Sequence, residues 1–528
     1  MIRSVAFTRK SLSILFFLLG LSFTALHASA QAAPAQPSPR ADNHISSLQA
    51  QQLFDLVDEL LHFASDETAL PIHSSVKRQL TTRDAVETYL SQKFNENEDA
   101  KRMQRSEIVL KKFGLLDRDF DLKPFLLSLL KEQIEAYYDP KSKTVNLLDW
   151  ISIEEQKPVL AHELTHALQD QHVDLEKWGD QTPEGVSSNA ADDATHLAKD
   201  EMDTAREAVI EGQATAVMMD NILKPMGRSL IQDPEVVDVI KQHMNGAGDS
   251  PILARAPLLL SESLMFPYRE GLSFEQDVWM DKGQEAAFAG ALEHPPTSSW
   301  EIINPREYEQ RHVPAVPLLP DIHPLINKLY KPYDIGQVGQ LDVHILTKIF
   351  AGDAAARDLT PAWNGGIYWA GQQRKATEAE LSSTQSIALL YLSSWKSPRS
   401  AERFAEVYAN QLGRKYSGLK PESSPDATST DSTRAQAFST SEGPVLILTR
   451  GNLVFVAESF DLPLAYRLGE LLLDAQGTGA LQMAAQPLPP APFAAGQPRD
   501  PLTGSLVRFL SQCGVMKFAV DAALGAVR

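Results

Sequence analysis

Apolar residues recur at helical spacing through the first third of the chain. The clearest run begins near residue 45, and the same spacing returns over 82–94, 107–113 and 122–136. Residues three and four positions apart share one helix face, so these runs predict amphipathic helices. The apolar positions of the first helix are Leu48, Leu53, Leu56, Val57, Leu60 and Leu61. We expect 45–134 to be the first lobe of a larger domain, because no linker or basic processing site follows it. An inhibitory propeptide is the alternative.

Residues 135–148 predict a β-hairpin. Two β-prone runs flank the turn Asp139-Pro140-Lys141-Ser142, and turn-forming residues between such runs are typical of antiparallel strand pairs. The hairpin comes just before the next predicted helix, so an exposed edge strand there could hold an extended peptide by backbone hydrogen bonds. A hairpin that only closes the core is the alternative.

A helix is expected over 159–171. Leu160, Leu164 and Leu168 form one ridge at four-residue spacing, which predicts a helix packed on a core behind and facing a cleft in front. Pro158 suits the first turn of this helix, and no Gly or Pro follows before residue 172.

The next stretch, 174–203, is acidic and rich in Gly, Pro, Ser and Asn, which indicates a solvated surface loop. Helical spacing returns over 194–222, and a further amphipathic run extends through residue 291.

From about residue 335 the pattern changes to alternating strands and helices. Helices are predicted at 341–350, 398–416 and 462–475, strands at 366–370, 386–392, 445–448 and 453–458, and a Ser/Thr-rich loop at 417–442. These elements predict a small α+β accessory domain over 335–485. A Pro-rich linker, 486–501, leads to a terminal helix, 506–527. This helix lacks a strongly basic face, so we expect it to dock on the protein rather than on a membrane.

Residues 1–30 have the organisation of a secretory signal peptide. Arg3, Arg9 and Lys10 form the basic start, an apolar run covers 11–26, and Ala28-Ser29-Ala30 offers a small-residue cleavage site. The mature chain is expected to begin at Gln31 with a Pro/Ala linker, 31–44. We therefore expect an exported protein, periplasmic or extracellular. An uncleaved anchor is the alternative, although the apolar run is short for a span of about 20 residues.

Composition narrows the fold and the function. There are 68 acidic and 49 basic residues, and the net charge of −19 argues against a nucleic-acid partner. After signal cleavage no stretch is long and apolar enough for stable membrane insertion. The one cysteine, Cys513, excludes an internal disulfide, so stability must come from a core. The pattern predicts an α+β protein, with a mainly helical region over 45–334 and a small α+β C-terminal domain.

Residues 162–166 read His-Glu-Leu-Thr-His, the H-E-x-x-H pattern. His162 and His166 stack one turn apart on one helix face, where both imidazoles can bind one zinc ion. Glu163 lies between the two histidines along the helix axis, where its carboxylate can take a proton from a metal-activated water as a general base. A buried helix that carries two satisfied histidines is the alternative.

A third ligand must come from beyond this helix. Glu207 and Glu211 lie one turn apart on one face of the 194–222 helix, so one can bind the metal while the other supports the ligands. Asp170 and Glu207 are candidates for orienting the imidazoles. Zinc peptidases also need a donor for the oxyanion, and Tyr268, His294 and Tyr308 are candidates by residue type alone. For each of the last three, a packed or capped residue in a turn is the alternative.

The H-E-L-T-H sequence and the downstream Glu211-Gly212-Gln213-Ala214 segment resemble the gluzincin metallopeptidases. The Glu-Gly-x-Ala context is similar to that of their aminopeptidase branch. The resemblance implies a zincin-like fold with His162, His166 and Glu211 as zinc ligands and Glu163 as base and proton shuttle. The chain departs from the aminopeptidases in the 45 positions between His166 and Glu211 and in lacking a G-x-M-E-N exopeptidase motif. With the Tyr-Asp-Pro hairpin and the Pro-Pro-Thr-Ser segment, it also resembles poorly characterised exported gluzincin-like proteins of bacteria and archaea, over about 48–308.

We therefore expect a zinc-dependent metallopeptidase with one zinc ion per chain and a peptide or protein substrate. Two other interpretations stay open at this point. One is a noncatalytic binding protein that keeps a structural zinc or none, and the other is a zinc hydrolase that acts on a bond other than the peptide bond.

Overall fold

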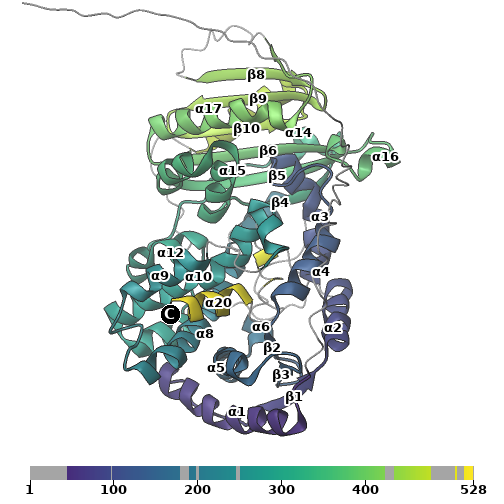
Figure 1. Cartoon of the computed structure of the whole chain (residues 1–528). Coiled ribbons are helices and arrows are strands. Elements are labelled where there is room, and N and C mark those ends of the chain that lie inside the picture. The colour runs from purple at the N-terminus through teal and green to yellow at the C-terminus, as the bar shows by residue number, and fades with distance from the viewer. Residues whose placement is uncertain are drawn as a thin grey trace, which may run out of the picture. The chain divides into compact units, whose positions relative to one another are not determined.

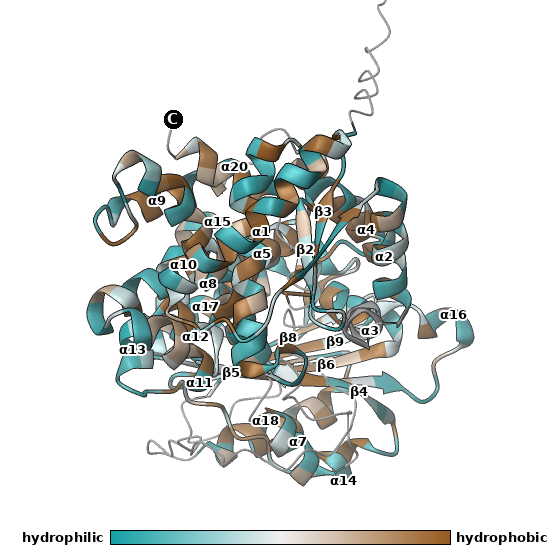
Figure 2. Cartoon of the chain, turned by 90° about the horizontal axis from the view of Figure 1, so that it is seen from below, coloured by the Kyte–Doolittle hydropathy of each residue, from teal (hydrophilic) through white to brown (hydrophobic). Residues whose placement is uncertain are grey.

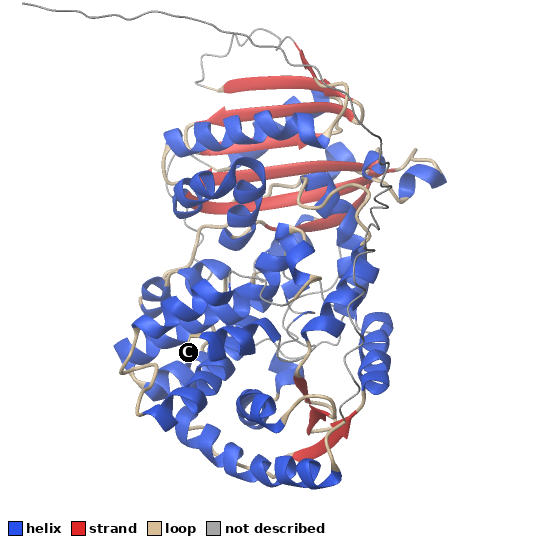
Figure 3. Ribbon diagram, in the orientation of Figure 1, coloured by secondary structure: helices blue, strands red, loops and turns tan. Residues whose placement is uncertain are grey.

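A computed structural model describes residues 44–96, 98–178, 189–197, 201–244, 250–422, 433–476, 506–507, 510 and 517–526. The expected signal peptide, nearly all of the 31–44 linker, the 486–501 linker and Cys513 lie outside these residues. Within them the fold is α+β, as predicted, with a mainly helical region followed by a seven-stranded sheet (Figures 1 and 3). None of the helices in these ranges combines the length and the apolar character needed to cross a bilayer.

The helical region extends from Ser47 to Ile326 and confirms the helices predicted in the first third of the chain. Its α-helices are α1 Ser47–Thr68, α2 Arg83–Glu96, α3 Glu98–Phe113, α4 Leu122–Gln133, α5 Ile153–Val173, α6 Leu175–Trp178, α7 Ala190–Leu197, α8 Met202–Leu223, α9 Glu235–Met244, α10 Leu258–Lys282, α11 Ala291–Glu293, α12 Ser299–Ile303, α13 Pro305–Glu309 and α14 His323–Ile326. A π-helical segment, η3 (Ala286–Gly290), precedes α11.

Helix α1 packs along α5 and buries Leu53, Val57, Leu60 and Leu61. Leu48, which we placed in the same apolar stripe, is instead 69% exposed. It precedes Leu53 by five positions, and a residue five positions away lies off the face that a helix shares at spacings of three and four.

A small sheet lies beside α5 and contains the predicted hairpin. Its strands are β1 Lys77–Thr81, β2 Ala136–Asp139 and β3 Thr144–Leu148, in the order β1-β3-β2. Strand β3 pairs antiparallel with β2 and parallel with β1. Strand β2 is therefore an edge strand of this sheet, as the hairpin prediction requires for peptide binding. Its side chains from Ala136 to Tyr138 are nevertheless buried.

Helix α5 begins earlier than the sequence suggested. Ser152 is its N-cap and forms a capping box with Glu155, in which the serine hydroxyl accepts from the Glu155 amide and the glutamate accepts from the Ser152 amide. Pro158 therefore lies inside the helix and not in its first turn, because the capping box fixes the start at Ile153. The ridge of Leu160, Leu164 and Leu168 is fully buried, which confirms the predicted core-facing side.

The larger sheet has the strand order β4-β5-β6-β10-β9-β8-β7, and every neighbouring pair is antiparallel. Its strands are β4 Tyr330–Gln337, β5 Trp363–Gln373, β6 Ile387–Trp395, β7 Lys420–Glu422, β8 Arg434–Thr440, β9 Gly443–Arg450 and β10 Leu453–Glu458. The hairpin predicted across Gly451 is confirmed, and this glycine has a φ of 57°.

Helices cover both faces of this sheet. Residues such as Tyr391 share a core with α15 (Gln340–Leu359) and α17 (Pro398–Lys415), which lie over one face in Figure 1. Alternate residues such as Leu390 share a second core with α18 (Leu462–Ala475). In Figure 2 the strands β6 and β9 have apolar colour, in contrast to the hydrophilic α13. The predicted 462–475 helix coincides with α18, and the other two helices predicted here, 341–350 and 398–416, are confirmed.

Two segments differ from the predictions. The 417–442 segment, predicted as a loop, contains β7 and β8, since β8 is a half-exposed strand that is defined by pairing with β9 rather than by apolar alternation. The 174–203 segment, also predicted as a loop, contains the short helices α6 and α7. The predicted domain boundary at 334 falls inside β4, which begins at Tyr330.

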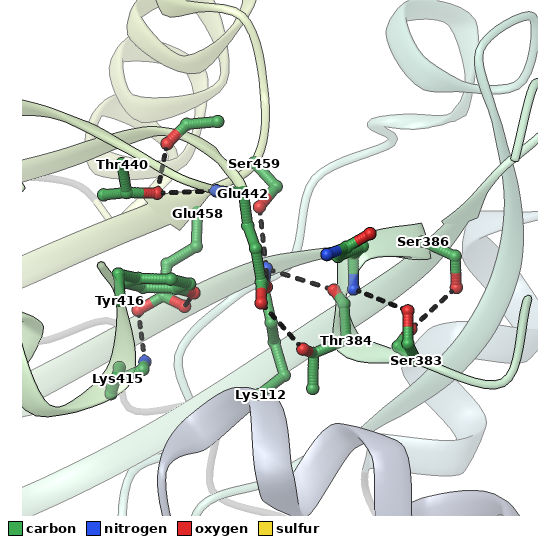
Figure 4. Close-up of polar contacts among 12 residues, drawn as sticks. Lys112, Ser383, Thr384, Ser386, Lys415, Tyr416, Thr440, Glu442, Glu458 and Ser459 are labelled. Carbon is green, nitrogen blue, oxygen red and sulfur yellow. Dashed lines mark hydrogen bonds and ion pairs between the residues drawn. The ribbon is translucent and has the colours of Figure 1, made fainter. Parts of the chain in front are cut away.

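A buried ionic cluster joins α3 to the larger sheet (Figure 4). It consists of Lys112, Lys415, Glu442 and Glu458, and the exposed Arg118 pairs with Glu442 at its edge. Lys112 is fully buried, and its ammonium donates to Glu442 Oε2 at 3.0 Å, to Ser459 Oγ at 2.7 Å and to Thr384 O at 3.3 Å. All three donors of this cation are therefore satisfied, which is the condition under which a buried charge is tolerated.

Helix α20 (Lys517–Gly525) docks on the helical region, in agreement with the prediction of a docked terminal helix. The backbone N–H of Phe518 donates to Gln133 Oε1 at 3.1 Å. The Phe518 ring is buried and packs edge-on against Tyr268 of α10, with 5.2 Å between ring centroids. Helix α20, although far from α10 in sequence, therefore covers Tyr268.

Candidate metal centre

Helices α8 and α10 cross in backbone contact at two glycines. A Cβ atom on Gly212 would lie 2.4 Å from the Gly271 carbonyl group, and one on Gly271 would lie 2.1 Å from Ala208 O. Neither position has room for a side chain. The crossing therefore brings Glu211, which precedes Gly212, close to Tyr268, which lies one turn before Gly271.

Gly212→Ala is expected to destabilise the protein, although alanine has the higher helix propensity. Overpacking at the crossing costs about 1–3 kcal/mol and more than offsets a propensity gain of about 1 kcal/mol. Gly413→Ala in α17 is the matched control, because the nearest atom to its added Cβ is 3.9 Å away. Urea unfolding should show a lower midpoint for Gly212→Ala and an equal or higher one for Gly413→Ala. Equal gains in both variants would contradict a tight crossing.

Three side chains converge where α5 faces α8. His162 Nε2 lies 3.0 Å from His166 Nε2 and 3.1 Å from Glu211 Oε2, and the distance from His166 Nε2 to Glu211 Oε2 is 3.7 Å. Tetrahedral zinc bonds of about 2.0–2.1 Å place two ligand atoms about 3.3 Å apart. In the described part of the chain, these residues form the group of His, Asp and Glu side chains that can hold a metal ion. For brevity we refer to this candidate site, His162, His166 and Glu211, as the metal centre.

The charges of His166 and Glu211 are coupled. Burial lowers the pKa of His166, but the Glu211 carboxylate outweighs burial and raises this pKa to about 9. Burial raises the pKa of Glu211, but the two imidazoles outweigh it and lower that pKa to about 2. In the metal-free protein His166 therefore carries a proton at neutral pH, which a metal ion would displace.

Glu163 lies between the metal centre and the edge strand β2. Its Oε2 accepts a hydrogen bond of 2.5 Å from the backbone N–H of Tyr138. This N–H belongs to the edge of β2 that does not pair with β3. The carboxylate that could act as a base is thus held beside the strand that could hold a peptide.

Tyr268, a candidate oxyanion donor, lies beside the metal centre. Its ring stacks on His162 with 6.1 Å between centroids and 19° between planes. Burial raises the pKa of Tyr268 well above its ordinary value, and Glu211 and Glu163 raise it further. The phenol therefore stays protonated, and its side chain hydrogen-bonds to the Glu211 carboxylate.

The remaining candidates lie elsewhere. Glu207 is half-buried and outside the convergent ligand set, although its charge is felt at Tyr268. Asp170 does not bond to an imidazole; it accepts from Tyr138 Oη at 2.7 Å and from Lys143 Nζ at 2.7 Å, and so ties the hairpin to α5. His294 is exposed, and its carbonyl accepts from Tyr308 Oη at 2.9 Å. The structure therefore brings neither His294 nor Tyr308 into the group.

Two glutamines next to the metal centre were not among the sequence candidates. Gln169 Oε1 lies 2.8 Å from His166 Nδ1, and Gln169 Nε2 donates to Gln213 Oε1 at 2.9 Å. Spacing could have found the first, because Gln169 follows His166 by three positions and shares its helix face. Gln213 carries no such signal, since its contact with α5 depends on the packing of two helices.

The metal centre is more enclosed than expected. We predicted a cleft in front of α5, but His162 and Glu163 are 0% exposed, Glu211 is 2% exposed and His166 is 8% exposed. The prediction considered α5 alone, whereas α8, α10 and β2 cover its front.

Comparison of the chain with protein families, with curated proteins and with solved structures finds no match.

Proposed function

We propose that the protein is a zinc-dependent metallopeptidase. The convergence of His162 Nε2, His166 Nε2 and Glu211 Oε2, with Glu163 beside them, is the observation that carries the proposal. Two imidazoles and one carboxylate are the ligand set of catalytic zinc sites that leave a fourth position open. The resemblance to gluzincins supports the same assignment. The proposal includes 45–134 as the first lobe of the enzyme and export of the mature chain.

The residues around the metal centre have defined tasks in this proposal. His162, His166 and Glu211 would hold a zinc ion, and that ion would supply Lewis acidity toward a substrate carbonyl and an attacking water. Glu163 takes the proton of that water and delivers it to the leaving nitrogen. The Tyr268 phenol would exchange its hydrogen bond to Glu211 for one to the oxyanion. Strand β2 holds the peptide extended beside Glu163 by backbone hydrogen bonds.

The burial of the metal centre favours a second candidate, a noncatalytic protein with a structural zinc. Closed sites are typical of structural zinc, although these usually have four protein ligands, and the metal centre offers three. A hydroxamate should block a zinc hydrolase and have no effect on a binding protein. A hydroxamate-sensitive protein that cleaves no peptide would favour a zinc hydrolase with another substrate.

The zinc content of the purified mature chain tests the proposal directly. We expect about one zinc per chain in the wild type, and the same content in Glu207→Ala, because Glu207 lies outside the ligand set. Glu211→Ala is expected to lose the zinc, because only two ligands remain. Elemental analysis after reconstitution and desalting measures all three. A wild type without zinc would overturn the proposal.

A further inference from the structure

The hydrogen-bond partner of His166 leads through two buried glutamines to backbone carbonyls. His166 Nδ1 lies 2.8 Å from Gln169 Oε1, and Gln169 Nε2 lies 3.0 Å from Ile210 O and 2.9 Å from Gln213 Oε1. Gln213 Nε2 in turn lies 3.0 Å from both Ala287 O and Phe288 O. Both glutamine side chains are 0% exposed.

The direction of every hydrogen bond in this series follows from the backbone carbonyls at which the series ends. A backbone carbonyl can only accept, so the NH2 group of Gln213 must face Ala287 and Phe288. The Gln213 oxygen then faces Gln169. The NH2 group of Gln169 has two acceptors, Gln213 Oε1 and Ile210 O, and its oxygen must therefore face His166.

An amide oxygen also only accepts, so His166 must donate from Nδ1. Because Nδ1 keeps its proton, the lone pair of the neutral imidazole lies on Nε2, the atom among the ligand atoms of the metal centre from which a metal ion would displace the second proton. The two amide orientations rest on carbonyls, and they fix the tautomer without any assumption about hydrogen positions.

We propose that Gln169, supported by Gln213, is a positioning residue that holds His166 in the tautomer that can bind metal. This inference rests on the proposed function and adds to it a residue outside the ligand set. Gln213 is itself held by two carbonyls of η3, and π-helical segments such as η3 recur at functional sites. The support serves one imidazole only, because His162 Nδ1 is buried without a hydrogen-bond partner among the described residues.

The inference predicts a specific loss of metal affinity. Gln169→Met keeps the length of the side chain but removes its acceptor, so zinc should bind about 10–100-fold more weakly. Gln156→Met is the matched control on the same helix. Gln156 is also 0% exposed, and it bonds to the backbone of Leu148 and Ile151, but it touches no ligand. Zinc affinity in this control should equal that of the wild type.

Zinc dissociation constants measured by competition with a chelator, beside thermal unfolding of the metal-free proteins, separate positioning from scaffolding. We expect Gln169→Met and Gln156→Met both to lose thermal stability, but of these two only Gln169→Met should lose zinc affinity and change the visible spectrum of bound Co²⁺. Gln213→Met removes the support of Gln169 but leaves the bond between Gln169 and His166 in place, so it should show a smaller loss of zinc affinity. It also provides the test if Gln169→Met does not fold.

Equal zinc affinity in Gln169→Met and the wild type would overturn the positioning role and leave the proposed function standing. Equal losses of affinity in Gln169→Met and Gln156→Met would also overturn it, since they would indicate general destabilisation. A wild type that binds no zinc would instead contradict the proposed function itself.

Discussion

Glu163→Gln is expected to lower the turnover number about a thousandfold or more while the zinc content stays at the wild-type level. A general base contributes about 10²–10⁴-fold to a rate, and Glu163 moves the proton in both halves of the proposed reaction. Glutamine has the same shape and keeps an oxygen that can accept from the Tyr138 N–H, which now bonds to Glu163 Oε2. The fold and the ligands should therefore be unaffected.

Cleavage of a quenched fluorescent peptide library, with zinc measured on the same samples, tests this expectation. Glu207→Gln is the control, because it removes a carboxylate near Tyr268 that lies outside the ligand set. Full activity in Glu163→Gln would refute its role as the base. Loss of zinc together with activity would indicate that Glu163 supports the ligands instead.

Glu458→Gln is expected to destabilise the protein by about 3–5 kcal/mol, the usual cost of breaking a buried ion pair. Glu458 is 0% exposed, pairs with the buried ammonium of Lys415 and accepts from Tyr408 Oη at 2.8 Å and from Tyr416 Oη. Glutamine would leave Lys415 with an uncompensated charge. Its NH2 group would also face donors that need an acceptor.

Urea unfolding at pH 7 measures this loss, with Glu470→Gln on the exposed side of α18 as the control. Burial raises the pKa of Glu458, but Lys415 and Lys112 outweigh it and hold this pKa below its ordinary value. A lowered carboxyl pKa stabilises the fold above about pH 4.5, and this contribution is lost as the pH falls further. The gap between wild type and Glu458→Gln should therefore narrow in acid. A variant as stable as Glu470→Gln would contradict the role of the ionic cluster.

The sequence pattern within a segment was sufficient to predict those elements that are defined by their own residues. The α18 helix has a continuous apolar face, and its predicted bounds match the observed ones. The hairpin of β2 and β3 is marked by turn formers. His162, Glu163 and His166 share a helix turn, so their proximity follows from helix geometry alone.

Contacts between distant segments could not be predicted in the same way. Lys112 bonds to Glu442 across 330 positions, and no spacing rule links these residues. Strand β8 is defined by its register with β9, which a single segment does not reveal. The enclosure of the metal centre and the support of His166 by Gln213 both depend on the packing of α8 and α10 against α5.

Gly212 and Gly271 also govern which parts of the metal centre can move. Packed helices slide past one another through small adjustments of interlocked side chains, but at this crossing backbone meets backbone, and backbone has no rotamers to adjust. Helices α8 and α10 should therefore move as one body, with Glu211 and Tyr268 at a constant separation. An opening for the proposed peptide substrate is therefore not expected between α8 and α10, whereas displacement of the β2–β3 hairpin, which Asp170 ties to α5, would provide one.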